Sequence, residues 1–205
     1  SLRQKDSDKD AEFVASLARK FDLPFYVRKE DVYKYQVENK LSLEEAARRV
    51  RYTFLESVSE TNRFNKIALG HHCDDNAELV LMNLFRGSGP KGISGIPPVR
   101  DEKIIRPLIN LKRSEIIDYL ETKGLKYVSD TSNLDTRYIR NRIRLKLIPL
   151  LKESYNPKII DTLNRLSEII GFEEEWIEDI IHPLFEKTAL SLQDDIASFS
   201  VPRLK

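Results

Sequence analysis

The sequence predicts an α/β protein in which a parallel sheet with helices on both faces is followed by a helical segment. Up to about residue 128, short apolar stretches typical of strands alternate with amphipathic stretches of helical period. From about residue 137 the pattern is helical alone. We therefore expect an α/β domain over residues 1–128, a helical segment over 129–182 and the beginning of a further domain over 183–205.

The α/β part divides at recognisable helix starts. Ser7 with Asp10, and Ser42 with Glu45, have the spacing of capping boxes, in which each side chain bonds to the other residue's backbone N–H. In chain order we expect a helix over 8–21, a strand over 23–27, a helix over 43–61, a strand over 66–70, a helix over 75–86, a strand over 103–106 and a helix over 112–123.

Glycine and proline mark the remaining boundaries. A glycine-rich loop follows the helix over 75–86 and ends at Pro97-Pro98. Asn156-Pro157 separates two expected helices, 137–152 and 157–181. Residues 194–205 alternate like a strand.

The composition is that of an ordinary globular protein, with 40% hydrophobic and 33% charged residues and a net charge of +1. Cys73 is the only cysteine, which excludes an internal disulfide and the CxxC zinc frameworks. Because the sequence has neither an apolar run of membrane-spanning length nor a signal peptide, we expect a cytoplasmic protein. The first residue is Ser1, which suggests a fragment.

The charges are unevenly distributed. Residues 137–152 carry six Lys or Arg and no acid, whereas residues 167–186 carry seven acids and no Lys or Arg. A basic block of this kind indicates a polyanionic partner, and the alternative is a solvated helix face.

The stretch GHHCDDNAELVLMNLFRGSGPKG, residues 70–92, concentrates side chains that carry chemistry. Asp74 is a plausible N-cap, and Asp75 and Glu78 lie in the first turn of the expected helix, where acids complement the helix dipole. Capping explains neither the two histidines nor the glycine-rich exit.

A divalent metal ion is one interpretation of this stretch. His71, His72, Asp75 and Glu78 are suitable ligand types, but adjacent histidines on an extended segment point to opposite sides. A catalytic zinc site is therefore disfavoured. A magnesium ion held by Asp75 and Glu78 with substrate phosphates is more reasonable. A metal-dependent hydrolase remains an alternative function.

A nucleotide is the other interpretation. Glycines of the loop allow backbone N–H groups to approach phosphates, and Arg86 and Lys91 supply positive charge. The stretch contains neither a Walker A motif nor GxGxxG, so the composition alone is a weak signal.

Four segments together resemble one family. They are EEAARRVRYTFL (44–55), ALGHHCDDNAELVLMNLFRGSGPKGISGI (68–96), IIRPLINLKRSEIIDYL (104–120) and SDTSNLDTRYIRNRIRLKLIPLL (129–151). In this order and spacing the sequence is similar to the bacterial tRNA(Ile)-lysidine synthetases, a family of N-type ATP pyrophosphatases with a PP-loop, or adenine nucleotide alpha hydrolase-like, domain.

The resemblance implies an activity and its partners. The family uses ATP and Mg²⁺ to adenylate the wobble cytidine of a tRNA(Ile) with a CAU anticodon, with release of pyrophosphate. Free L-lysine then displaces AMP and forms lysidine. The family also suggests a possible homodimer.

The resemblance also implies roles for particular residues. Asp75 and Glu78 match the family's important acids and would hold Mg²⁺ or the lysine ammonium. Arg48 and Arg51, one turn apart, would reach the phosphates or the activated base, and the alternative is a pair of solvated arginines. The remaining implied residues are His71, facing the site, and the nucleotide-binding set Asp74, Arg86 and Lys91.

The basic segment fits tRNA binding. An apolar face of the expected helix, made by Ile139, Ile143, Leu147 and Leu150, would pack inward. The basic and polar residues then contact the tRNA backbone, in agreement with the family's use of this segment. The expected tRNA-binding residues are Arg137, Arg140, Asn141, Arg142 and Arg144. Asp130, Asn133 and Asp135 are expected to be turn and cap residues.

The family's SGGxDS ATP loop does not occur in the sequence. We therefore expect this chain alone to bind ATP weakly or not at all, and to be inactive by itself. A non-catalytic RNA-binding fragment remains a second alternative. A tRNA thiolase is disfavoured, because such enzymes generally use several cysteines or an iron–sulfur cluster, as far as the resemblance extends.

Overall fold

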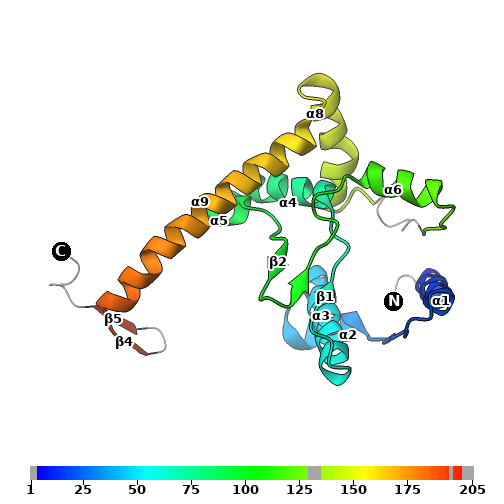
Figure 1. Ribbon diagram of the computed structural model, residues 1–205, viewed down its shortest axis with the longest axis horizontal. Helices are drawn as coiled ribbons and strands as arrows, with labels where there is room; N and C mark the ends of the chain where they lie inside the picture. The colour runs from blue at the N-terminus through cyan, green and yellow to red at the C-terminus, as the bar shows by residue number, and fades with distance from the viewer. Residues whose placement is uncertain (1–3, 129–134, 194–195, 200–205) are drawn as a thin grey trace. The chain divides into compact units, whose positions relative to one another are not determined.

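The computed structural model describes residues 4–128, 135–193 and 196–199. The chain divides into two compact units, and Figure 1 labels their elements. Unit 1 comprises the residues up to Leu69 together with Val99–Ile105 and Lys126–Val128. Unit 2 comprises Gly70–Pro98, Arg106–Leu125 and the described residues from Asp135 onward.

Unit 1 begins with helices. They are α1 (Gln4–Lys20), α2 (Val32–Asn39) and α3 (Leu43–Thr61). The bounds of α3 agree with the prediction, and its capping box is present, with the Glu45 N–H donating to Ser42 Oγ at 3.2 Å and the Ser42 N–H to Glu45 Oε2 at 3.1 Å. The capping box predicted at Ser7 is wrong, because α1 begins at Gln4 and Ser7 lies inside it.

The segment before α2 differs from the prediction. Residues 23–27 form no strand, and Leu23 and Val27 are exposed, so the apolar alternation there has no sheet to join. The segment is instead held by Tyr26, whose hydroxyl donates to Asn62 at 2.7 Å and whose ring meets Phe64 edge-on. Helix α2 was not anticipated. Asp31 caps it by accepting hydrogen bonds from the backbone N–H groups of Tyr33 and Lys34.

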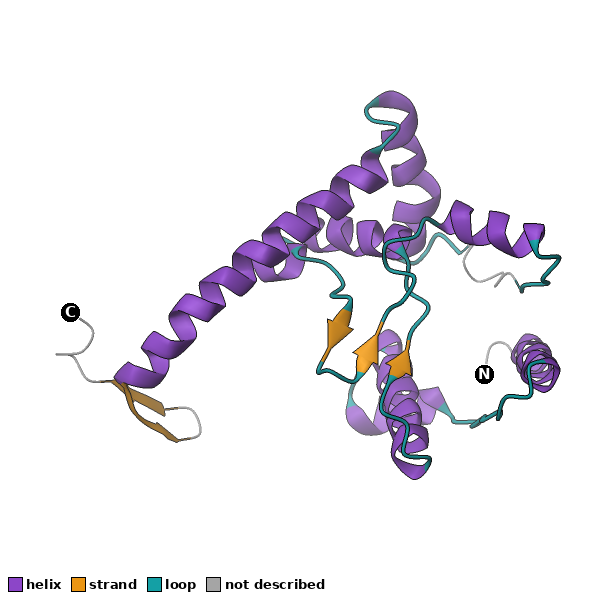
Figure 2. Cartoon of the chain, viewed as in Figure 1, coloured by secondary structure: helices purple, strands orange, loops and turns teal. Residues whose placement is uncertain are grey.

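The sheet of unit 1 is small and mixed (Figure 2). Its strands are β1 (Ile67–Ala68), β2 (Val99–Arg100) and β3 (Ile104–Ile105), in the order β1-β3-β2. The pairing of β1 with β3 is parallel, as expected, and places Ile67 opposite Ile104. Strand β2 was not anticipated and runs antiparallel to β3, because a tight turn with positive φ at Asp101 and Glu102 reverses the chain.

Unit 2 begins with the motif helix. Its first helices are α4 (Cys73–Phe85), α5 (Pro90–Ile93) and α6 (Arg113–Thr122). Helix α4 starts two residues earlier than predicted, with His72 as the N-cap residue, so the assignment of Asp74 as N-cap is wrong. Helix α5 is a single turn inside the predicted glycine-rich loop, with Pro90 at its first position, where the absent N–H costs nothing.

The helical part of unit 2 follows the predicted division at Asn156-Pro157. It consists of α7 (Ile139–Arg142), a π-helical turn η2 (Ile143–Leu147), α8 (Ile148–Ser154), α9 (Ile159–Thr188) and an antiparallel hairpin of β4 (Ala189–Gln193) and β5 (Ile196–Phe199). Helix α9 continues seven residues beyond the predicted end at 181 and contains Pro183.

Helix α4 forms the core of unit 2. Five of its side chains, Cys73, Ala77, Val80, Leu81 and Met82, are buried against Ile143, Ile148, Ile160 and Leu163. The predicted inward face of the basic segment is confirmed at Ile143, Ile139 and Leu147, which pack on this core. It is wrong at Leu150, which is 51% exposed. Within the described part of the chain, no helix has the length and apolarity needed to cross a membrane.

Candidate functional site

The first turns of α4 present the two acids of the motif on one face. Asp75 and Glu78 are three residues apart, so their side chains lie one above the other on the helix. Arg140 in α7 and Arg144 in η2 are four residues apart and share a face in the same way. The packing of Ile143 on the α4 core turns these arginines toward the acids. We call these four residues the acid–arginine quartet.

Hydrogen bonds join all members of the quartet. Arg140 donates from Nε to Glu78 Oε2 and from Nη2 to Asp75 Oδ1, both at 2.8 Å. Arg144 donates from Nε to Glu78 Oε1 at 2.5 Å, and from Nη2 to Glu78 Oε2 at 2.9 Å and to Asp75 Oδ1 at 3.1 Å. Two carboxylates therefore accept hydrogen bonds from two guanidinium groups. Charge-assisted hydrogen bonds of this kind are the strongest between side chains.

The quartet is buried on its acidic side and open on its basic side. The Glu78 side chain is 1% exposed, whereas those of Arg140 and Arg144 are 38% and 23% exposed. Burial disfavours the charged form of Arg144, but its hydrogen bonds to Glu78 and the charge of Asp75 outweigh burial and raise its pKa. A charged Glu78 in such a position depends on its partners, because a lone buried carboxylate is costly.

His72 contacts the acids, and the role predicted for His71 stays a prediction. Its Nε2 lies 3.4 Å from Asp75 Oδ2, and its Nδ1 lies 3.6 Å from Asp74 Oδ2. The His72 backbone N–H also donates to Asp75 Oδ2 at 3.1 Å. The contact of His72 with Asp74 and Asp75 was not available from the sequence.

Asp74 sits beside the quartet and has a different set of partners. Its Oδ2 accepts a hydrogen bond from the Arg113 backbone N–H at 2.8 Å, which links α4 to the start of α6. Burial tends to raise the pKa of Asp74, but His72 and the Arg113 N–H stabilise the carboxylate more and lower that pKa to about 2. Asp74 is therefore ionised throughout the physiological range.

Cys73 is not a nucleophile in this arrangement. It is buried, and burial together with the neighbouring charge of Asp74 raises the pKa of its thiol to about 12. The thiolate is the reactive form of cysteine, so the thiol of Cys73 is inert at neutral pH.

Asn76 is a structural residue that the sequence gave no reason to select. Its Nδ2 donates to Asn164 Oδ1 and to Ser167 Oγ, both at 2.9 Å, and its Oδ1 accepts from the Ile96 N–H at 2.7 Å. Asn164 in turn donates to the Cys73 carbonyl at 2.9 Å. This network ties the start of α4 to α9 and to the loop before β2, and so fixes the helix that carries the acids.

The predicted nucleotide-binding residues do not meet at the quartet. Arg86 caps the opposite end of α4 and is exposed, and eleven residues of helix place it on the order of 16 Å from Asp75. Lys91 is an exposed residue of α5. Asp74 alone of this set lies beside the quartet. The nucleotide-binding roles of all three remain predictions.

The predicted tRNA-binding residues divide into two groups. Arg140 and Arg144 belong to the quartet, whereas Arg137 and Arg142 are exposed. Arg137 pairs with Asp135, with Nη2 at 2.7 Å from Oδ2. The Asn141 amide donates to the Asp135 carbonyl at 2.8 Å, so Asp135 organises the turn before α7, as predicted. Asp130 and Asn133 lie outside the described residues.

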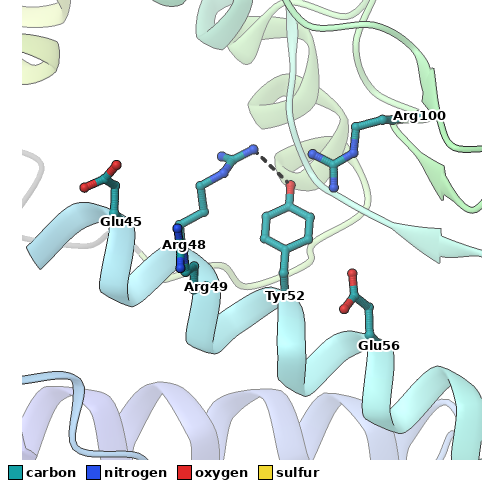
Figure 3. A pocket seen from close by; sticks show the side chains of 6 residues that line it. All are labelled: Glu45, Arg48, Arg49, Tyr52, Glu56 and Arg100. Carbon is teal, nitrogen blue, oxygen red and sulfur yellow. Dashed lines mark hydrogen bonds between the residues drawn. The ribbon is translucent and has the colours of Figure 1, made fainter. Parts of the chain in front are cut away.

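Arg48 and Arg51 belong to α3 in unit 1. Figure 3 shows Arg48 reaching toward Tyr52, to whose hydroxyl its Nη2 donates at 3.4 Å. Arg48 lines an open pocket together with Arg49, Tyr52 and Arg100 of β2. Arg51 is exposed and is not among the residues that line this pocket. The catalytic roles of Arg48 and Arg51 remain predictions.

The quartet does not accommodate Mg²⁺ as it is arranged here. Both oxygens of Glu78 and Oδ1 of Asp75 accept hydrogen bonds from guanidinium groups, and Asp75 Oδ2 accepts one from the His72 N–H. In the part of the chain that the structure describes, no three His, Cys, Asp or Glu side chains converge as a metal site. We therefore derive no step through a metal ion at Asp75 and Glu78, and Mg²⁺ binding there stays a prediction.

Comparison with known proteins identifies relatives of the chain. The family model described as "PP-loop domain" matches residues 1–151. A tRNA(Ile)-lysidine synthase of Clostridium acetobutylicum is 43% identical over 179 residues, which cover 87% of this chain and 39% of that protein. The enzymes of the same name from Clostridioides difficile and Bacteroides thetaiotaomicron are each 38% identical, covering 86% and 87% of this chain and 38% and 42% of theirs.

A solved structure supports the fold. The U34-tRNA thiolase NcsA from Methanococcus maripaludis, with its [4Fe-4S] cluster, superposes with a TM-score of 0.58 at 18% identity, covering 80% of this chain and 57% of that one. At this identity the likeness concerns the fold alone. The chain spans about two fifths of the length of the curated relatives that it matches.

Proposed function

Because the chain belongs to the PP-loop domain family, we propose that it takes part in ATP-dependent lysidine formation on a tRNA(Ile) with a CAU anticodon. The names of its relatives support this proposal, since three tRNA(Ile)-lysidine synthases cover 86–87% of it at 38–43% identity. ATP, the co-substrate, supplies the adenylyl group that activates the wobble cytidine. L-lysine and the tRNA are the other substrates, and the cytoplasm is the compartment where they meet.

The acid–arginine quartet is the observation that carries the proposal. A lysine substrate enters as a cation, and it needs a carboxylate that is ionised yet shielded from water. Glu78 offers a shielded carboxyl group, because its side chain is 1% exposed while the arginines that cover it are 38% and 23% exposed. We propose that the lysine ammonium takes the place of a guanidinium donor on Glu78 and Asp75.

The same acids have a chemical task once lysine is bound. The amine must lose a proton before its nitrogen attacks C2 of the activated cytosine and AMP leaves with the former O2. We assign proton acceptance to Asp75, which lies at the rim of the quartet beside His72. Arg140 and Arg144, displaced from the acids, become available for the phosphates of the tRNA or of the departing AMP.

No observation specifically favours a metal-dependent hydrolase, a tRNA thiolase or a non-catalytic RNA-binding protein. The described residues hold no cluster of metal-ligand side chains, which a metal-dependent hydrolase would need. The raised pKa of the Cys73 thiol, about 12, gives a thiolase mechanism no nucleophile here. Non-catalytic RNA binding is separated from ligation by the experiment that follows.

A ligation assay tests the proposal. This chain and the longest polypeptide that contains it are incubated with radiolabelled lysine, ATP and a tRNA(Ile) transcript with a CAU anticodon. We expect the longer polypeptide to incorporate lysine in an ATP-dependent way, and this chain alone to be inactive. Asp75→Asn and Glu78→Gln should each lower the rate at least about 100-fold, the usual effect of losing an acid–base or charge-stabilising group.

The controls separate catalysis from binding. Glu175→Gln removes an exposed acid of α9 and should leave the rate unchanged. Arg140→Ala combined with Arg144→Ala should weaken tRNA affinity as well as the rate. Sedimentation of the same samples reports whether the homodimer forms. Full tRNA affinity without lysine incorporation by the folded longer polypeptide would replace the proposal with non-catalytic RNA binding.

A further inference from the structure

Unit 1 contains an open pocket of about 340 Å³ between α3 and β2 (Figure 3). Arg48, Arg49 and Tyr52 of α3 line it together with Arg100 of β2. Glu45 and Glu56 of α3 complete the lining. Three of the six lining side chains are therefore arginines, brought together from two segments that are about 50 residues apart in sequence.

Tyr52 holds two of these guanidinium groups. The guanidinium carbons of Arg48 and Arg100 lie 4.9 and 4.8 Å from the centroid of its ring. Figure 3 shows the two arginines on opposite sides of the ring, with both guanidinium groups near the hydroxyl end. A cation–π contact contributes about 0.5–1 kcal/mol at an exposed site, which holds each cation in place but leaves its charge uncompensated.

In the described part of the chain, one carboxylate forms an ion pair with these arginines, through Nε of Arg100. Glu45 Oε2 accepts hydrogen bonds from the Ser42 N–H and hydroxyl in the capping box. Asp101 Oδ2 lies 3.3 Å from Arg100 Nε and forms an ion pair with it. Among the residues that the structure describes, Arg48 and Arg49 form no ion pair. Arg48 Nη2 donates to the Tyr52 hydroxyl, and among the described residues no other hydrogen bond engages the terminal nitrogens of Arg48 and Arg100. These nitrogens can therefore donate to an anion.

We propose that this pocket binds a phosphate group, with Arg48 and Arg100 as a two-sided clamp and the Tyr52 hydroxyl between them. Planar guanidinium groups are the preferred partners of phosphate oxygens. The inference rests on the proposed function only for the source of the phosphate, which is either the polyphosphate of ATP or the backbone of the tRNA. It adds Arg100 and Tyr52 to the residues considered above, and Arg51 does not line the pocket.

Binding of inorganic tripolyphosphate to the full 205-residue chain tests the pocket directly by isothermal titration. We expect Arg100→Gln to weaken binding about tenfold, the effect of losing one charge-assisted contact. Tyr52→Phe, which keeps the ring and removes the hydroxyl, should weaken it a few-fold. Arg19→Gln removes the same charge from an exposed site of α1 and is the matched control, expected to bind within twofold of the unchanged chain.

Thermal unfolding of every variant accompanies the titrations. If Arg100→Gln lowers the melting temperature substantially, Arg100→Lys replaces it, because this variant keeps the charge and loses only the planar fork. The clamp then predicts weaker binding by Arg100→Lys as well. Tripolyphosphate affinities of Arg100→Gln and Tyr52→Phe equal to that of Arg19→Gln would overturn the inference.

Two further titrations identify the source of the phosphate. ATP and a single-stranded RNA oligonucleotide are titrated into the same variants. If Arg100→Gln weakens the binding of ATP alone, the pocket is assigned to the nucleotide. If it weakens the binding of RNA alone, the pocket is assigned to the tRNA backbone. The inference and the proposed function fail separately. If the longer polypeptide fails to incorporate lysine while Arg100→Gln still weakens phosphate binding, only the proposed function is contradicted. If lysine is incorporated while Arg100→Gln leaves phosphate binding unchanged, only the pocket is contradicted.

Discussion

Glu78 shows how a single buried charge can depend on its neighbours. Its carboxylate accepts hydrogen bonds from Arg140 and Arg144 and is almost completely shielded from water. Glu78→Gln keeps the shape but removes the charge that both guanidinium groups compensate. We expect it to lower the free energy of unfolding by about 1–3 kcal/mol, less than for a fully buried pair because the arginines are partly exposed.

Urea denaturation measures this effect. Glu175→Gln, at an exposed position of α9, is the matched control and should change the free energy of unfolding by less than about 0.5 kcal/mol. Equal stability of the two variants would show that the quartet contributes nothing to the folded state.

Asp74 makes a prediction about pH. Its pKa is about 2 in the folded chain against an ordinary value of 3.8, so the unfolded chain binds the proton more tightly. The stabilisation is therefore complete above about pH 4 and is lost as the pH falls toward 2, by up to about 2 kcal/mol. We expect the stability difference between the unchanged chain and Asp74→Asn to shrink over that range. Denaturant unfolding at pH 5, 4, 3 and 2 measures it, and a constant difference would contradict the assignment.

At the scale of elements, Gly95 fixes the loop that leads from α5 to β2. Its φ is +77°, and a Cβ at this position would run into the side chain of Asn76. Gly95→Ala therefore strains the backbone and disturbs the network that joins α4 to α9. We expect it to lower the free energy of unfolding by about 1–3 kcal/mol.

Gly70→Ala is the control for this substitution, because nothing lies within 4 Å of a Cβ built there. Thermal unfolding of the two variants gives the comparison. Equal melting temperatures of Gly95→Ala and Gly70→Ala would contradict this prediction. They would mean that the loop accommodates the Cβ without loss of stability and that the Asn76 network does not require glycine at position 95.

The sequence predicted elements where the evidence was local. The helix over 43–61 has its own capping box and a continuous apolar face, and both of its ends were correct. The motif helix was also found from its local sequence, although it begins two residues earlier than predicted and its N-cap is His72 and not Asp74. Residues 23–27 show the opposite case, because an alternating apolar stretch becomes a strand only if a neighbouring strand pairs with it. Strand β2 and the π-helical turn η2 likewise depend on distant packing.

The sequence was sufficient to select the residues of the candidate site, but it did not predict which of them contact one another. Asp75, Glu78, Arg140 and Arg144 were all selected from the sequence, but the acids and the arginines were assigned to different ligands. The two pairs are more than 60 residues apart, and the packing of Ile139, Ile143 and Leu147 on the α4 core brings them together. The contacts of His72 with the acids, and the hydrogen bonds made by Asn76, depend on side-chain directions that residue spacing alone does not determine.

At the scale of the whole molecule, α9 exposes an unusual number of large apolar side chains from Phe172 onward. They are Phe172, Trp176, Ile177, Ile180, Ile181 and Leu184. Apolar surface of this extent is uncommon on a protein that stays monomeric. Trp176, the only tryptophan, is 66% exposed and reports directly on this surface.

Fluorescence of Trp176 tests this surface. In dilute solution we expect the wavelength of maximum emission to lie close to that of the urea-unfolded chain, and we expect acrylamide to quench the fluorescence strongly. A homodimer formed through α9 predicts that emission shifts to shorter wavelength and that quenching weakens as the chain concentration rises. Ile180→Glu places a charge on the same surface and should abolish the concentration dependence. Shielded emission at the lowest concentration would contradict the exposure of α9.

In the proposed function, the acid–arginine quartet also sets how strongly salt opposes RNA binding. A cation displaces a condensed counterion from the RNA only if no protein anion already holds it, and each displaced ion contributes about −0.7 to the slope of log K against log salt on a single strand. Of the six cations in residues 137–152, Arg140 and Arg144 are held by Glu78 and Asp75, and Arg137 by Asp135. The segment should therefore show a slope about half as steep as its six charges imply. Breaking the quartet with lysine should release two more cations to the RNA and steepen that slope.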